Sequence, residues 1–130
     1  MIKYGKPRCK VCEILITGNK FLVNNHILVP NKAITCISDN LVYCMVCNNC
    51  SQYYIGETGD TLRHRMTLHR QHINHEQYSI LHVSNHIRNC GRGFKVFPFY
   101  KLTDMTCDFV RRKMEKYFIK LYDPPLNSHP

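Results

Sequence analysis

Two short apolar runs, each carrying a tyrosine, flank a closely spaced pair of cysteines in the middle of the chain. The runs are Leu41–Val46 and Gln52–Ile55, and the CxxC segment Cys47–Cys50 lies between them. Because β-prone runs joined by a short polar segment are typical of a hairpin, we expect two antiparallel strands here. Such a hairpin would place Tyr43 and Tyr54 on adjacent strands, where both phenols can reach one place.

The segments after this hairpin predict three helices and a third strand. Asp60 or Thr61 can cap the first helix, and Pro98 favours an edge position or a bulge for the strand. Apolar residues at helical or alternating spacing set the bounds. The expected elements are helices at Leu62–Ile73, Ser79–Asn89 and Cys107–Leu121, and a strand at Phe94–Leu102.

The first 40 residues predict an irregular, basic segment that holds a second CxxC pair. Two short β-prone runs follow this pair, Ile14–Thr17 and Phe21–Val23. Gly18-Asn19 separates them and is a hairpin-turn signal. We therefore expect a small hairpin around Gly18-Asn19.

The charge balance indicates a polyanionic partner. The 130-residue chain holds 18 lysine and arginine residues against nine acidic ones, a formal net charge of +9. Such an excess is typical of proteins that bind nucleic acid or an anionic membrane surface. No apolar run approaches the ~20 residues that a spanning helix needs, and the start of the chain lacks the apolar core of a signal peptide. We expect a soluble, intracellular protein.

Eight cysteines without an export signal indicate metal ligation rather than a disulfide framework. The alternative is a set of buried thiols, since cysteine is among the most buried residue types. The spacing of the CxxC pairs favours zinc. We expect a first zinc site from Cys9, Cys12 and Cys36, completed by His26 or by Cys44.

The predicted helices add groups suited to phosphodiester cleavage, which needs an activated water, a cation beside the phosphate and usually a divalent metal. Arg65 and His69 lie four residues apart in a predicted helix, so they point the same way. Glu115 in the last helix is a candidate metal ligand that can face the tyrosine hairpin. Alternatively, Glu115 is a solvated residue that pairs with Arg111 or Arg112.

The order of these residues resembles the GIY-YIG nuclease family. Its second motif is complete as Tyr54-Ile55-Gly56, whereas Leu41-Val42-Tyr43 keeps only the tyrosine of the first motif. In this comparison Asn127 would be a structural or site-edge residue. The resemblance covers roughly residues 41–127 and rests on Tyr43, Tyr54, Ile55, Gly56, Glu57, Thr58, Leu62, Arg65, His69, Glu115 and Asn127.

This resemblance implies an α+β fold in which a small three-stranded antiparallel sheet is flanked by helices. It also implies a DNA endonuclease that depends on a divalent metal. Tyr43 would be the general base or the water-orienting group, assisted by Tyr54 and His69. Arg65 would stabilise the phosphate, and Glu115 would hold magnesium or manganese, which prefer oxygen ligands.

The cysteines narrow the resemblance to the endonuclease domain of Penelope-like retroelements, which carries a zinc motif of two cysteines and two histidines. That likeness implies a reverse transcriptase joined in one polyprotein, work in the nucleus, and a nick whose 3′ end primes reverse transcription. The zinc ligands expected here are Cys47, Cys50, His86 and Cys90, with His82 in reserve.

We therefore predict an N-terminal basic zinc-knuckle segment, residues 1–40, and a nuclease domain, residues 41–130. The rival hypothesis is a non-catalytic, zinc-stabilised module that binds nucleic acid and derives from the same fold. Such a module has no need for Glu115 near the tyrosine hairpin, so their proximity discriminates between the two.

Overall fold

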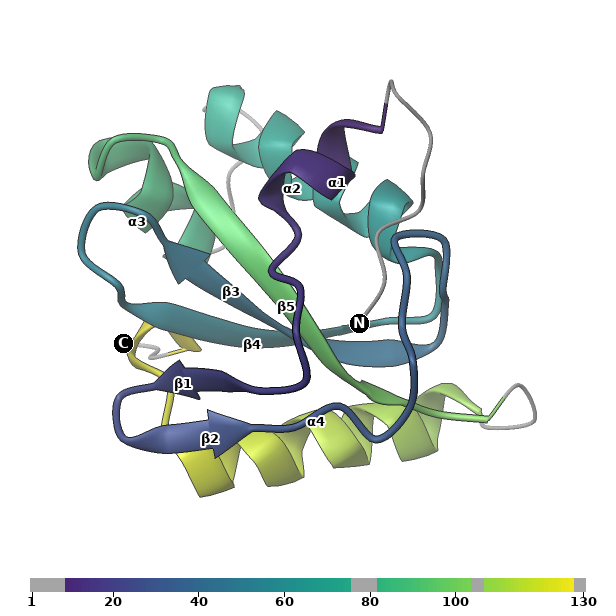
Figure 1. Cartoon of the computed structure of the whole chain (residues 1–130). Coiled ribbons are helices and arrows are strands. Elements are labelled where there is room, and N and C mark those ends of the chain that lie inside the picture. The colour runs from purple at the N-terminus through teal and green to yellow at the C-terminus, as the bar shows by residue number, and fades with distance from the viewer. Residues whose placement is uncertain (1–8, 76–81, 104–106, 128–130) are drawn as a thin grey trace.

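A three-stranded antiparallel sheet forms the centre of the molecule (Figure 1). The computed structural model describes residues 9–75, 82–103 and 107–127. The strands are β3 (Leu41–Cys47), β4 (Tyr53–Thr58) and β5 (Phe94–Lys101), in the order β4-β3-β5. The α+β class with a sheet flanked by helices is thus confirmed. The helices are α1 (Lys10–Ile14), α2 (Leu62–Asn74), α3 (His82–Asn89), α4 (Asp108–Tyr122) and the short 3₁₀ helix η2 (Pro125–Asn127).

The central strand β3 buries both of its faces, and this divides the core in two. We call the side that buries Leu41, Tyr43 and Met45 the α2 face, because α1, α2 and α3 cover it (Figure 1). The other side buries Val42 and Cys44 under α4, and we call it the α4 face. Residues from the first 40 positions enter both cores. They are Cys9, Val11, Cys12, Leu15, Ile34 and Cys36 on the α2 face, and Val23 and Leu28 on the α4 face.

The expected tyrosine hairpin is present as β3 and β4. Tyr43 lies opposite Gly56 in the register, and Met45 lies opposite Tyr54. The second strand extends beyond the expected run Gln52–Ile55, because β4 continues through Gly56 to Thr58. A glycine opposite Tyr43 leaves room for that ring without interrupting the ladder.

Pro98 has both of the properties expected of a proline in a strand. It lies in β5, which is an outer strand of the sheet. The register also shifts beside it, because Val42 pairs with Tyr100 whereas Tyr43 pairs with Pro98. Proline lacks a backbone N–H, so it fits where the ladder is interrupted.

The helices follow their sequence signals closely. Thr61 caps α2, and its hydroxyl accepts a hydrogen bond from the His64 backbone N at 3.1 Å. The described part of α3 begins at His82, and the expected start at residues 79–81 lies outside the described residues. None of the described helices is long and apolar enough to cross a membrane.

The small N-terminal hairpin differs from the prediction around Gly18-Asn19. Strand β1 (Phe21–Val23) pairs with β2 (His26–Leu28), and the turn between them is Asn24-Asn25. Both asparagines have positive φ, 43° and 72°, which this residue type tolerates and a two-residue hairpin turn requires. The run after Ile14 instead forms a parallel bridge from Leu15 to Val96 in β5.

Candidate active site and cysteine clusters

Tyr43 is the centre of a polar cluster buried on the α2 face. Its hydroxyl lies 2.8 Å from His69 Nε2 and accepts a hydrogen bond from Arg65 Nε at 3.2 Å. Arg65 and His69 both come from α2, one turn apart, as their spacing predicts. Tyr43 and His69 are 0% and 1% exposed, so the Tyr43 hydroxyl and His69 Nε2 form hydrogen bonds within the cluster and not with solvent.

The direction of the hydrogen bonds follows from the charges. Burial first, and then the nearby Arg65 cation, lower the pKa of His69 to about 3, so His69 is neutral at ordinary pH. Burial raises the pKa of the Tyr43 phenol, with Tyr54 adding to the shift and Arg65 opposing it. Because Arg65 donates to the phenol oxygen and the neutral His69 ring can accept at Nε2, we assign the phenol proton to the bond with His69 Nε2. Both shifts hold the pair in its neutral form at rest, with the phenol protonated and the imidazole unprotonated.

Gly56 lets the two tyrosines approach each other. A Cβ at this position would lie 2.7 Å from the Tyr43 hydroxyl and 2.7 Å from a Tyr54 ring carbon. The ring centroids of Tyr43 and Tyr54 are 6.5 Å apart, and Tyr54 is 6.0 Å from the His69 ring. Unlike Tyr43, Tyr54 is partly exposed, so it forms the solvent-facing side of this cluster.

Glu115 reaches the same cluster from α4. The pKa of its carboxyl is raised to about 7, first by burial and then by the Glu57 carboxylate, against the lowering influence of Arg65. The Glu115 charge in turn raises the pKa of Tyr43 and of Tyr54. Glu115 therefore belongs to one electrostatic site with the tyrosine hairpin.

Arg111, one helical turn before Glu115, ties α4 to the sheet. Its guanidinium donates to Glu57 Oε1 at 3.2 Å and to Asn40 Oδ1 at 3.0 Å. Its Nη2 also lies 2.8 Å from Asp108 Oδ1, and the residue is 6% exposed. Arg111 thus binds Glu57, Asn40 and Asp108 rather than Glu115, whereas the alternative pairing of Glu115 with Arg112 stays a prediction. No pattern in the sequence distinguishes Arg111 from its basic neighbours, so this network was not predicted.

Asn127 fastens the end of the chain to β4. Its Oδ1 accepts from Ile55 N at 2.7 Å, and its Nδ2 donates to Ile55 O at 2.8 Å. Strand β4 is an outer strand, so these two backbone groups face away from β3. The Asn127 amide therefore supports the backbone between Tyr54 and Gly56. Neither of its two hydrogen bonds involves the polar cluster.

A surface hollow of about 320 Å³ lies beside Arg65. It combines the Arg65 cation with oxygen-bearing side chains, a mixture suited to a phosphate and a hard cation. Its lining residues are Glu57, Thr58, Gly59, Asp60, His64, Arg65 and Leu68.

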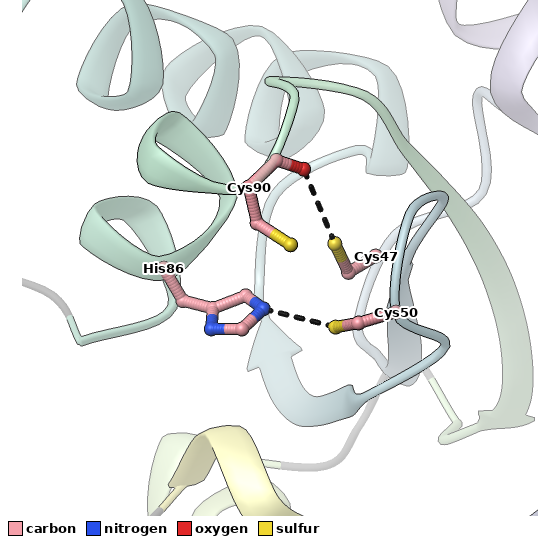
Figure 2. Close-up of side chains that lie close together, drawn as sticks. All are labelled: Cys47, Cys50, His86 and Cys90. Atoms are coloured by element: carbon pink, nitrogen blue, oxygen red, sulfur yellow. Dashed lines mark hydrogen bonds between the residues drawn. The ribbon is translucent and has the colours of Figure 1, made fainter.

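The turn of the hairpin and the end of α3 form a four-residue cluster, which we call the hairpin cysteine cluster (Figure 2). It consists of Cys47, Cys50, His86 and Cys90, whose ligand atoms lie within 4.8 Å of one another. Cys50 Sγ is 3.1 Å from His86 Nε2. Three sulfurs and one imidazole are a common zinc ligand set. The expected set is thus brought together, while His82 is exposed and lies outside this cluster.

Three more cysteines, Cys9, Cys12 and Cys36, form what we call the N-terminal cysteine cluster. Cys36 Sγ lies 3.4 Å from Cys9 Sγ and 3.7 Å from Cys12 Sγ. The structure does not bring the expected fourth ligands to it. His26 packs its ring against Tyr122, 5.2 Å away, and Cys44 is buried on the α4 face. Both therefore lie on the other side of the sheet from the three cysteines.

Comparison with known protein families places the polar cluster within a recognised catalytic domain. The family model for the GIY-YIG catalytic domain matches residues 39–127, more than half of the chain. No curated protein and no solved structure matches the chain. The matched range contains the tyrosine site and the hairpin cysteine cluster, whereas the N-terminal cysteine cluster lies before it.

Proposed function

The chain belongs to the GIY-YIG family, a family of nuclease domains, and we propose that it is a divalent-metal-dependent endonuclease that nicks DNA. The substrate follows from the family and from the formal charge of +9, which favours a polyanion. Basic side chains that bind phosphates position a duplex without reading its sequence.

The observation that carries this proposal is that a phenol, a neutral imidazole, a guanidinium and a carboxylate lie close enough to influence one another at one place on the sheet. These are Tyr43, His69, Arg65 and Glu115. A module that only binds nucleic acid has no use for a half-buried carboxylate whose ionisation is opposed by burial.

We assign the contact with the scissile phosphate to Arg65, whose planar fork matches phosphate oxygens. Tyr43 and His69 then handle the proton of the attacking water. The water gives its proton to the Tyr43 oxygen as the Tyr43 hydroxyl proton moves to His69 Nε2. Because burial keeps the pKa of His69 low, the imidazolium gives this proton up through solvent to the leaving oxygen. Because Tyr43 is fully buried, the partly exposed Tyr54 and Arg65 are the side chains that meet the DNA first.

Glu115 would hold the catalytic magnesium or manganese ion. The fit is electrostatic, because burial and the Glu57 carboxylate leave the negative charge of Glu115 poorly compensated. A bound divalent ion would neutralise charge on the phosphate and lower the pKa of a water.

The hairpin cysteine cluster would bind structural zinc, which favours a retroelement nuclease of the Penelope-like type. In that setting the domain would work in the nucleus beside a reverse transcriptase of the same polyprotein. This finer proposal rests on the cysteine pattern between and after the two tyrosines.

The test is nicking of supercoiled plasmid DNA in the presence of magnesium by the full chain. We expect the wild type to produce open circles and Glu115→Gln to produce almost none, a loss of at least about a hundredfold. Glu13→Gln is the matched control, since Glu13 is exposed on α1, and it should nick like the wild type.

Two outcomes would count against this assignment. If Glu115→Gln nicks at the wild-type rate, the metal is held elsewhere. If the wild type binds DNA, retains zinc and leaves the plasmid intact, the non-catalytic nucleic-acid-binding module is the better description.

A further inference from the structure

The N-terminal cysteine cluster has the spacing of a metal site. Tetrahedral zinc with Zn–S bonds of about 2.3 Å separates its sulfurs by about 3.8 Å. The sulfur of Cys36 lies 3.4 Å and 3.7 Å from those of Cys9 and Cys12. A disulfide needs about 2.05 Å, far less than either distance. The spacing therefore fits ligands around one ion better than a covalent pair.

The three thiols come from two separate segments of the chain. Cys9 and Cys12 flank the first turn of α1, and Cys36 is 24 residues further along the chain than Cys12. All three are at most 8% exposed. By contrast, the buried Cys44 on the α4 face belongs to neither thiol cluster. Packing alone gives no reason for the Cys36 thiol to converge with the thiols of a CxxC pair.

A guanidinium accompanies the thiols. Arg63 Nη2 lies 3.8 Å from Cys36 Sγ. Three thiolates around a divalent zinc ion carry a net charge of −1, which this cation would offset. A hollow of about 450 Å³, lined in part by Cys9, Lys10 and Arg63, adjoins the cluster and leaves room for a solvent ligand.

The cluster is also attached to the start of α2. The first N–H groups of a helix have no partner within it. Here Arg63 N donates to Cys36 O at 2.7 Å, and Leu62 N donates to Ser38 O at 2.9 Å. The turn that holds Cys36 therefore caps the helix that carries Arg65 and His69.

We propose that Cys9, Cys12 and Cys36 bind one Zn²⁺ ion as thiolates, with solvent as the fourth ligand, and that this ion fixes the start of α2. Each thiol releases its proton as the ion binds. The N-terminal segment is thereby fastened to the helix on which the polar cluster depends. Zinc binding at this site does not require the domain to be a nuclease.

The first test counts zinc in the purified full chain by native mass spectrometry. We expect two zinc ions in the wild type, one in Cys36→Ser and two in Cys107→Ser, since Cys107 is exposed at the start of α4. Glu115→Gln should also keep two, which separates this proposal from the nuclease assignment. The same zinc count in folded Cys36→Ser as in the wild type would overturn it.

The second test measures hydrogen exchange at the amides of Leu62 and Arg63. We expect protection of at least tenfold in the zinc-loaded wild type and in Cys107→Ser, and its loss in Cys36→Ser. Equal protection in Cys36→Ser and the wild type would refute the link to α2. If Cys36→Ser does not fold, the zinc count of the wild type and that of Cys9→Ser, a change at the edge of the cluster, decide instead.

Discussion

The two faces of the sheet differ in the groups that they bury, although strand β3 contributes side chains to both. On the α2 face, β3 buries Tyr43 against His69 and places both cysteine clusters around the apolar core. On the α4 face, the core is dominated by aromatic packing. The rings of Phe99 and Phe118 meet edge to face at 4.9 Å, and Phe118 stacks on Tyr122 at 6.0 Å. The contrast is one of composition, because the α2 face combines its apolar core with polar groups and thiols, whereas the α4 face is mainly apolar and aromatic.

Helix α4 connects the two faces. Phe118 packs into the aromatic core, whereas Glu115, three residues earlier, is close enough to the polar cluster to interact electrostatically with Arg65. Arg111 fixes this placement through Glu57 and Asn40. The α4 face therefore contributes one group to the site while stabilising the sheet behind it.

The largest expected effect tests the structural role of the α4 face. Phe118→Ala should lower the free energy of unfolding by about 3–5 kcal/mol, because it removes a ring that several aromatic side chains contact. Urea unfolding measures the loss. At a temperature where the variant remains folded, its nicking rate should stay near that of the wild type.

The control for this change is Phe109→Ala on the same helix, where the side chain is 64% exposed. It should alter stability by less than about 0.5 kcal/mol. If Phe118→Ala lost nicking while folded, the separation of the two faces would break down.

A smaller effect concerns the pH dependence of Glu115. Its pKa of about 7 in the folded protein exceeds its ordinary value of 4.5, so protons compete with a divalent ion near neutrality. Magnesium-dependent nicking should fall as the pH drops through 7, by up to about tenfold per unit at subsaturating magnesium. A rate that is constant between pH 8 and pH 5.5 would contradict this.

The same shift has a consequence for stability in the absence of metal. A raised pKa means that the folded state gains stability from the protonated carboxyl, and this gain is lost as the pH rises through 7. Metal-free Glu115→Gln should therefore be more stable than the wild type above pH 7. We expect about 1 kcal/mol, since solvent screens a partly exposed group, and no difference below pH 4.5. Urea unfolding at pH 8 and pH 4 checks the sign.

Much of the sheet and most of its helices could be predicted from the sequence, because their signals are local. The spacing of Tyr43 and Tyr54 around a CxxC pair, the cap at Thr61 and the place of Pro98 follow from short-range rules. The N-terminal turn was misplaced, because Gly18-Asn19 is a stronger turn signal by composition than Asn24-Asn25, which the pairing of β1 with β2 selects.

The polar cluster was only partly predictable. The spacing of Arg65 and His69 shows that they share a helix face, but no pattern shows which strand residue they meet. The network of Arg111 depends on contacts between segments more than 50 residues apart, namely Glu57 at 54 and Asn40 at 71. His26 failed as a ligand for the same reason, since only the tertiary fold places β2 on the α4 face.

If catalysis takes place on the α2 face, two buried tyrosines of the same hairpin should differ in their effect on it. The Tyr43 hydroxyl is hydrogen-bonded to His69 Nε2, 2.8 Å away, on the α2 face. Tyr53 belongs to the α4 face, is 1% exposed, and donates its hydroxyl proton to Tyr122 O at 2.5 Å. Each loses one buried hydroxyl on conversion to phenylalanine, so the two variants are closely matched in chemistry.

The deciding measurement is the single-turnover nicking rate of Tyr43→Phe and Tyr53→Phe at saturating magnesium. The rate should fall about 10²–10⁴-fold in Tyr43→Phe, while Tyr53→Phe should stay within about threefold of the wild type once both are folded. Equal rates in Tyr43→Phe and the wild type, or equal losses in both variants, would contradict the assignment of catalysis to the α2 face.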